Sequence, residues 1–218
     1  MAITTEPAQF LQLMAIMSPA FPIGSFAYSH GLEWAIDDGV VKTPDDVLDW
    51  ITALLVHGSG WNDAVLFVTS YDADDAGRTE IDELALALSA SRERVLETSD
   101  LGQSLAKSVA TLVANQAVKF KSYPVVFAAT CAGAGIDKRS GLLAFLQAFS
   151  NNLITVAVRL VPLGQNKGLE IMRELMPVII TTVEHAMTAS LDDLGSSTFL
   201  SDIAAMKHET QYSRVFRS

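Results

Sequence analysis

Apolar residues recur at intervals of three and four along almost the whole chain, which is the spacing of an amphipathic helix. The first such stripe consists of Phe10, Leu13, Met14 and Met17. Pro19 and Pro22 are expected to end this helix, because proline lacks the backbone N–H and clashes with the preceding turn.

Two later helices carry recognisable start signals. Thr43 can cap a helix, Pro44 suits the first helical position, and the two carboxylates that follow favour the positive end of the helix dipole. Asp137 can likewise cap a long helix that ends before Pro162. Both starts therefore have a physical cause beyond hydrophobic spacing.

The other periodic segments predict further helices over residues 61–71, 80–89, 91–113, 124–132 and 167–189, with Pro177 as a point for a kink and residues 72–77 as a polar loop. An outer, solvent-facing position is expected for Arg92, Glu93, Arg94 and Glu97. Residues 125–127 and 178–180 favour strands, but each lies inside a longer helical pattern. The pattern predicts an all-α protein, with one compact helical domain of roughly eight to ten helices over residues 1–218.

Half of the residues are apolar and the mean hydropathy is +0.29. The most apolar window, residues 142–163, contains Gln147, Asn151, Asn152 and Arg159 and falls short of the ~18 uninterrupted apolar residues of a membrane span. This window therefore predicts a buried helix and no membrane association. Because large exposed apolar patches mark interfaces, the composition indicates obligate partner proteins.

The formal net charge of −10 disfavours nucleic acid as a partner, since phosphate binding needs clustered Lys and Arg. Lys207, Arg214 and Arg217 make the last stretch locally basic, so it either docks on an acidic partner or is a solvated terminus. The single cysteine, Cys131, excludes an internal disulfide and favours a cytoplasmic location.

The sequence lacks a recognisable catalytic constellation. His30 and Glu33 are three residues apart and can share a helix face, where they would serve a metal, a partner surface or ordinary packing. His208-Glu209 has no second histidine at the zinc-protease spacing, and residues 164–168 lack the glycine spacing of a phosphate loop.

Five segments in the correct order carry a family resemblance. They are residues 21–33, 91–102, 123–127, 152–165 and 208–218. Across nearly its whole length the chain resembles the UreF family of urease accessory proteins, with the Pro-Ile-Gly turn and Ser-His-Gly-Leu-Glu run at 22–33 as the N-terminal signature. Many family members carry glycine where this chain has Ser25 or His30.

The resemblance implies an all-α homodimer that binds the accessory protein UreD (also called UreH) and the nickel-carrying GTPase UreG. Together these proteins deliver nickel to apo-urease. It further implies a non-enzymatic adaptor in the cytoplasm that needs no cofactor of its own. Two alternatives remain: a GTPase-activating regulator of UreG that uses Arg92, Arg94 or Arg159, and a helical enzyme that uses His30 and Glu33 as acid and base.

The expected partner-binding residues lie in the signature turn, in the helix after residue 91 and in a flexible tail over residues 205–218. They are Tyr28, His30, Glu33, Arg92, Glu93, Glu97, Tyr212, Arg214, Phe216 and Arg217. The first three either form a recognition surface or rivet the first two helices together. Arg92, Glu93 and Glu97 either form surface ion pairs or contact the GTPase. Tyr212 and Phe216 would share one face if the tail were helical.

Overall fold

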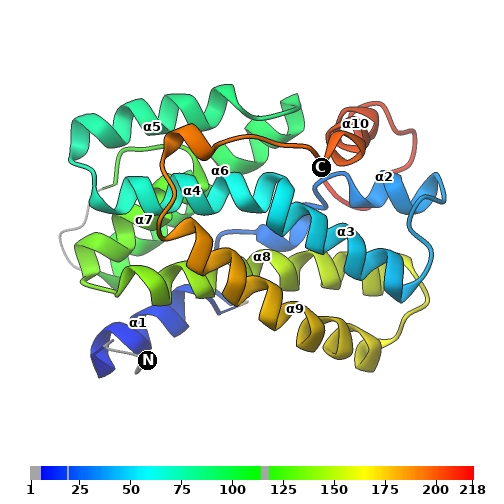
Figure 1. The fold of residues 1–218 in the computed structure, drawn as a ribbon, viewed down its shortest axis with the longest axis horizontal. Helices are drawn as coiled ribbons and strands as arrows, with labels where there is room; N and C mark the ends of the chain where they lie inside the picture. Colours follow the sequence, from blue (N-terminus) through cyan, green and yellow to red (C-terminus); the bar gives the residue numbers. More distant parts are fainter. Residues whose placement is uncertain (1–5, 19, 114–117) are drawn as a thin grey trace.

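Ten α-helices make up most of the described part of the chain (Figure 1). The computed structural model describes residues 6–18, 20–113 and 118–218. The α-helices are α1 (Pro7–Ile16), α2 (Leu32–Asp37), α3 (Pro44–His57), α4 (Ser59–Asp72), α5 (Asp75–Ala87), α6 (Arg92–Leu112), α7 (Tyr123–Ala134), α8 (Lys138–Leu160), α9 (Gln165–Ala186) and α10 (Phe199–His208). Two short 3-10 helices, η1 (Ser25–Ala27) and η2 (Leu191–Asp193), complete them, and no strand occurs in these residues. The predicted all-α class is confirmed.

The capping signals act as the sequence predicts. The Thr43 side chain accepts a hydrogen bond from the N–H of Asp46, whose carboxylate accepts from the N–H of Thr43, and this reciprocal pair begins α3. Asp137 accepts from the N–H of Ser140 at the start of α8. Pro19 lies outside the described residues, and α1 ends at Ile16.

The predicted loop at residues 72–77 is wrong in its extent. Helix α4 continues to Asp72 and α5 already begins at Asp75. Asp74 caps α5 by accepting a hydrogen bond from the N–H of Gly77, so the polar residues there form a helix start. Helix α9 runs through Pro177, and the 178–180 segment is helical.

Helix α7 packs mainly against α4 and α6, and it also contacts α8 and α5. Eight consecutive residues from Pro124 to Cys131 are buried. A helix that is apolar on all sides belongs in a core. Phe67, Phe127 and Phe145 stack with ring centroids 5.5 to 6.2 Å apart and join α4, α7 and α8.

By length and composition alone, α8 would suffice to cross a bilayer, but half of its most apolar window is buried inside the protein. The core helix of a folded domain passes the same test. In Figure 1, α8 runs beneath α3 and α4 and behind α9. The expectation of a buried helix over this window agrees with that packing.

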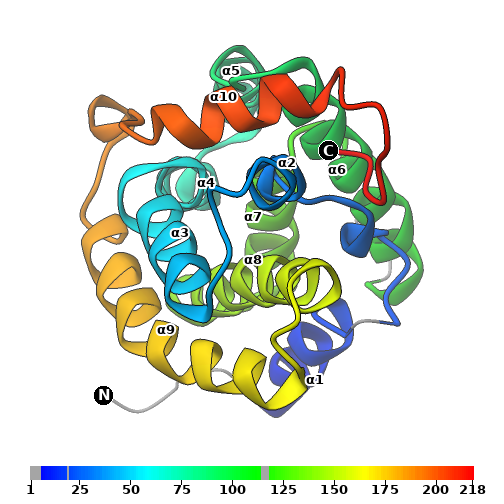
Figure 2. The ribbon, with the colours of Figure 1, turned by 90° about the vertical axis from the view of Figure 1, so that its right-hand side faces the viewer.

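The chain ends beside its own N-terminal region. After α10 the last residues turn back toward α2 and α6, where the C-terminus lies (Figure 2). The N–H of Arg217 donates to the carbonyl of Ala27, and the N–H of Ser29 donates to that of Ser218, at 2.7 Å each. The first and the last of the five family-like segments are therefore neighbours in space.

Candidate functional site

The signature turn brings the start of α2 close to α10. Gly24 and Gly31 have φ of 77°, and His30 has φ of 54°. A Cβ atom on Gly31 would lie 2.5 Å from the backbone N of Ala205, so only glycine lets α10 pass this close to α2. His30 tolerates its left-handed backbone because its ring is held by Glu97 at 2.8 Å and by an edge contact to Phe149.

Glu33 is the first anchor of the C-terminal segment, which we define as residues 209–218. Its buried carboxylate accepts hydrogen bonds from the N–H groups of Val215 at 2.6 Å and Phe216 at 2.8 Å. The Nε2 of His208 also lies 3.0 Å from the Oε2 of Glu33, within hydrogen-bond distance. One side chain of α2 therefore fixes both the end of α10 and the segment that follows it.

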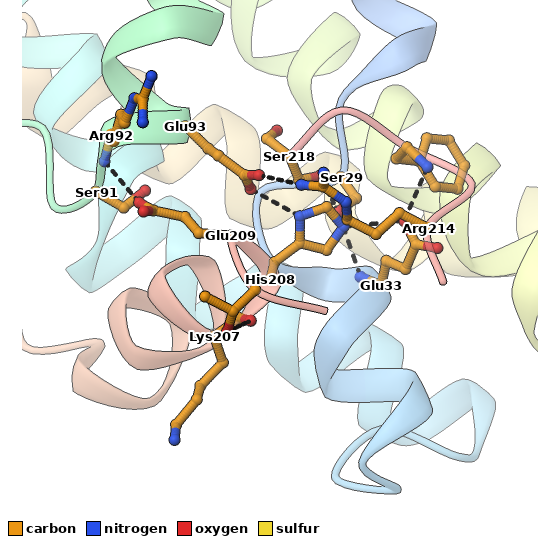
Figure 3. A network of polar contacts seen from close by, with 12 residues as sticks. Ser29, Glu33, Ser91, Arg92, Glu93, Lys207, His208, Glu209, Arg214 and Ser218 are labelled. Carbon is orange, nitrogen blue, oxygen red and sulfur yellow. Dashed lines mark hydrogen bonds and ion pairs between the residues drawn. The ribbon is translucent and has the colours of Figure 1, made fainter. Parts of the chain in front are cut away.

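His208 is fully buried between two carboxylates, as Figure 3 shows. Its Nδ1 lies 2.7 Å from Glu93 of α6, opposite the Nε2 contact to Glu33. A carboxylate therefore faces each ring nitrogen, and the ring bridges α2 and α6. Arg214 adds a positive charge by donating to Glu93 at 2.7 Å.

Glu97, one turn beyond Glu93, anchors the end of the segment. It pairs with His30 and Arg94 and accepts a hydrogen bond from the Ser218 hydroxyl at 2.9 Å. Burial alone would raise the pKa of Glu97, but the charges and hydrogen bonds of Arg94 and His30 outweigh it and lower the pKa to about 2. Glu97 is therefore an ionised, fully buried anchor.

Tyr28 and Asp100 hold Arg217 at the edge of this network. The Tyr28 hydroxyl donates to Asp100 at 3.0 Å, and Arg217 contacts both the Tyr28 hydroxyl at 3.1 Å and Asp100 at 3.2 Å. Burial, together with the Asp100 carboxylate, raises the pKa of Tyr28 far above its usual range. The phenol is therefore a neutral hydrogen-bonding group that positions Arg217.

The C-terminal segment has an inner and an outer side. Phe216 is buried under the Arg159 guanidinium, 4.9 Å from the ring centroid, and Ser218 is buried against Ser29 and Glu97. By contrast, Tyr212 is 105% exposed and Val215 is 61% exposed. The network thus holds a segment whose outer side carries an aromatic and an aliphatic side chain.

The structure divides the ten predicted site residues into two groups. Those that are buried are Tyr28, His30, Glu33, Glu93, Glu97 and Phe216. Those that are exposed are Arg92, Tyr212, Arg214 and Arg217. The buried signature residues join the signature turn to α6, α10 and the C-terminal segment, and they do not join the first two helices to each other. Partner binding by the ten residues stays a prediction.

Two expectations about these residues are wrong. Glu93 and Glu97 do not lie on a solvent-facing side of α6, because their carboxylates contact His208, Arg214 and His30 on the inner side of that helix. Tyr212 and Phe216 do not share a helix face, because α10 ends at His208. Flexibility of residues 205–218 in solution stays a prediction, but the structure places this segment against the body.

Sequence reasoning left Ser29, Asp100 and Ser218 unassigned. Ser29 and Ser218 lie within two of the family-like segments, so the pairing of those segments was the available signal. The sequence holds no comparable signal for Asp100, because its partners Tyr28 and Arg217 are 72 and 117 positions away.

A cavity of about 250 Å³ adjoins the network beside α4 and α8. His30, Asp63 and Arg94 line both this cavity and a smaller one of about 80 Å³. The Nδ1 of His30 is buried with no hydrogen-bond partner among the described residues. Within that part of the chain, no group of three or more His, Cys, Asp or Glu side chains could hold a metal ion.

Burial raises the pKa of Asp63 to about 7; Arg94 opposes this shift and Glu97 adds to it. Between pH 3.8 and about 7 the folded chain keeps a proton that the unfolded chain loses, so stability falls as pH rises. We therefore expect Asp63→Asn to raise the free energy of unfolding at pH 8 by on the order of 2 kcal/mol and to leave it unchanged near pH 4. Urea denaturation at both pH values tests this, and an equal change at both would contradict it.

Comparisons with known proteins agree with the resemblance of the sequence. A sequence model of the UreF family matches residues 41–176. The urease accessory protein UreF of Mesorhizobium japonicum is 44% identical over 99% of this chain and 100% of its own length. The urease accessory protein UreF 1 of Brucella canis is 46% identical over 99% of this chain and 97% of its own length. The urease accessory protein UreF of Rhodopseudomonas palustris is 40% identical over 98% of this chain and 94% of its own length.

Proposed function

The chain belongs to the UreF family of urease accessory proteins, and we propose that it is a non-catalytic adaptor that acts with UreD and the GTPase UreG to insert nickel into apo-urease. Membership of the family implies a role in urease maturation. The adaptor role, the named partners and the nickel cargo are the proposal. One observation carries it. The inner side of the C-terminal segment is hydrogen-bonded to Glu33 and Glu97, and its outer side leaves Tyr212 and Val215 exposed to solvent.

The composition of that outer side supports protein binding. Tyr212 and Val215 are exposed beside Arg214 and Arg217, and tyrosine and arginine dominate the binding energy of many interfaces. The backbone of residues 215–218 is already held by Glu33, Ala27 and Ser29, so less ordering entropy opposes binding than for a free tail.

The network also supports a structural role for the candidate acid and base. Glu33 is occupied by three hydrogen-bond donors, and His30 is paired with Glu97. Two of the arginines that a GTPase-activating role would use already have partners, since Arg94 pairs with Glu97 and Arg159 lies over the Phe216 ring. These contacts favour an adaptor over either alternative.

The proposal includes a homodimer in the cytoplasm. Exposed apolar side chains on α1 and η1 are available for self-association; they are Phe10, Leu11, Met14 and Phe26. Cys131 is buried, and burial raises the pKa of its thiol far above the usual range, which suits a protein that keeps its cysteine reduced.

Reconstitution with purified components tests the proposal. Apo-urease, UreD, UreG, GTP with Mg²⁺, bicarbonate and Ni²⁺ are expected to yield urease activity only when this chain is added. A mixture without GTP is the matched control. Equal activation without the chain, or hydrolysis of urea by the chain alone, would overturn the adaptor role.

A further inference from the structure

A second surface, separate from the C-terminal segment, lies at the other end of α10. A groove of about 510 Å³ runs between α3 and the start of α10, and we call it the α3–α10 groove. Figure 2 shows α10 crossing above α3 and α2, with its first turn on the α3 side. The volume falls within the ~300–1,000 Å³ typical of binding pockets.

The groove is lined mainly by apolar side chains that the chain leaves uncovered. Phe199 is 71% exposed and Leu200 is 49% exposed, and both begin α10. Val40 and the half-buried Trp50 continue the apolar surface on the α3 side. Phenylalanine and leucine side by side at a groove rim cost solvation free energy unless a partner covers them.

The α3 side of the groove is strongly acidic. Asp46 and Asp49 line it, and further acidic residues nearby in the sequence are Asp37, Asp38 and Asp45. The N–H groups of Lys42 and Thr43 lower the pKa of Asp46, so this carboxylate stays ionised while it caps α3. The basic side chains of this region are Lys42 and His57, which are fewer than the five aspartates, so the region carries a net negative charge.

We propose that the α3–α10 groove binds an amphipathic segment of a partner protein, with its apolar side chains against Phe199, Leu200 and Trp50 and its Lys or Arg side chains facing Asp46 and Asp49. Charge complementarity selects this occupant, because a basic segment is attracted to the acidic side and an acidic one is repelled. The geometry is that of an amphipathic helix laid in an apolar groove. This site goes beyond the proposed function, since it gives α10 a binding surface at each end.

Trp50 provides a direct reporter for occupancy. Its Nε1 is sealed from solvent and has no acceptor among the described residues, so its resonance responds to a chain that enters the groove. Protein labelled with ¹⁵N-tryptophan gives one indole signal for each of its 3 tryptophans, and Trp50→Phe identifies the relevant one. The probe is a synthetic amphipathic helical peptide of alternating leucine pairs and lysine pairs, and its charge-reversed counterpart carries glutamate for lysine.

The lysine peptide is expected to shift the Trp50 signal in a saturable way at about 150 mM salt, and the glutamate peptide to leave it in place. Asp49→Lys and Phe199→Ser should each raise the Kd at least tenfold. Glu80→Lys, the same charge reversal at an exposed position of α5, should change the Kd less than twofold. Circular dichroism confirms that each variant is folded.

Three outcomes would overturn the proposal. They are no shift with the lysine peptide, equal shifts with both peptides, and a loss of affinity in Glu80→Lys as large as in Asp49→Lys. If Asp49→Lys or Phe199→Ser instead changes the molecular mass of the free protein in solution, the groove is an interface with a second copy and the partner segment is wrong.

Discussion

Replacing Glu33 by alanine is expected to lower the free energy of unfolding by about 3–5 kcal/mol and to release the C-terminal segment. The substitution leaves His208 buried beside Glu93 alone and removes the acceptor of two backbone N–H groups, those of Val215 and Phe216. Buried donors without acceptors carry their full desolvation cost. Urea denaturation gives the stability change, and hydrogen exchange at the two amides gives the release.

The matched control is Glu80→Ala at an exposed position of α5, which is expected to change the free energy of unfolding by less than about 0.5 kcal/mol. Amides of Val215 and Phe216 that stay protected in Glu33→Ala would show that Glu33 does not anchor the segment.

Replacing Gly31 by alanine is expected to displace α10 and to cost at least about 3 kcal/mol. Two effects add: the left-handed backbone strains an alanine by about 1–2 kcal/mol, and its Cβ would meet the backbone of α10 at Ala205. Backbone atoms of a helix cannot move aside singly, so the whole helix must shift. Thermal or urea denaturation measures the cost.

Gly24 offers a closely matched control. It has the same φ of 77°, but a Cβ atom on Gly24 would have no neighbouring atom within 4 Å, so Gly24→Ala reports the backbone strain alone. We expect Gly31→Ala to be the more destabilising by about 2 kcal/mol. Equal losses in the two variants would mean that contact between α2 and α10 is not the determinant.

Most of the fold follows from local information in the sequence. Thr43 and Asp137 cap α3 and α8 as their positions predict, and the apolar run after Pro124 becomes the buried core helix α7. The start of α5 was missed because the polar residues around Asp74 suit a loop and a capped helix equally. Only the tertiary environment decides between them.

The sequence singled out most residues of this network but not their arrangement, and their binding of a partner stays a prediction. Glu93 and Glu97 belong to a polar helix surface by pattern, and charged side chains at such positions usually face water. Their inward direction depends on His208, Arg214 and His30, which lie more than 60 positions away in the sequence. Hydrophobic periodicity holds no information about such distant hydrogen-bonding partners.

The same limit explains the signature turn. The positive φ of Gly31 and the passage of α10 over it join residues 174 positions apart, so the need for glycine could not be read from the turn itself. Once these segments meet, the buried acids and the buried histidine form one network that shapes the outer side of residues 209–218.

The affinity of this chain for purified UreD tests the central claim most directly, with Tyr212→Ser compared to Leu169→Ser. Both side chains are exposed, Tyr212 fully and Leu169 at 70%, so neither substitution disturbs the core. We predict that Tyr212→Ser weakens binding about 30-fold, the loss of a ~2 kcal/mol hot spot, and that Leu169→Ser on α9 changes it less than about twofold. Equal affinity of Tyr212→Ser and the unmodified chain for UreD would contradict the account.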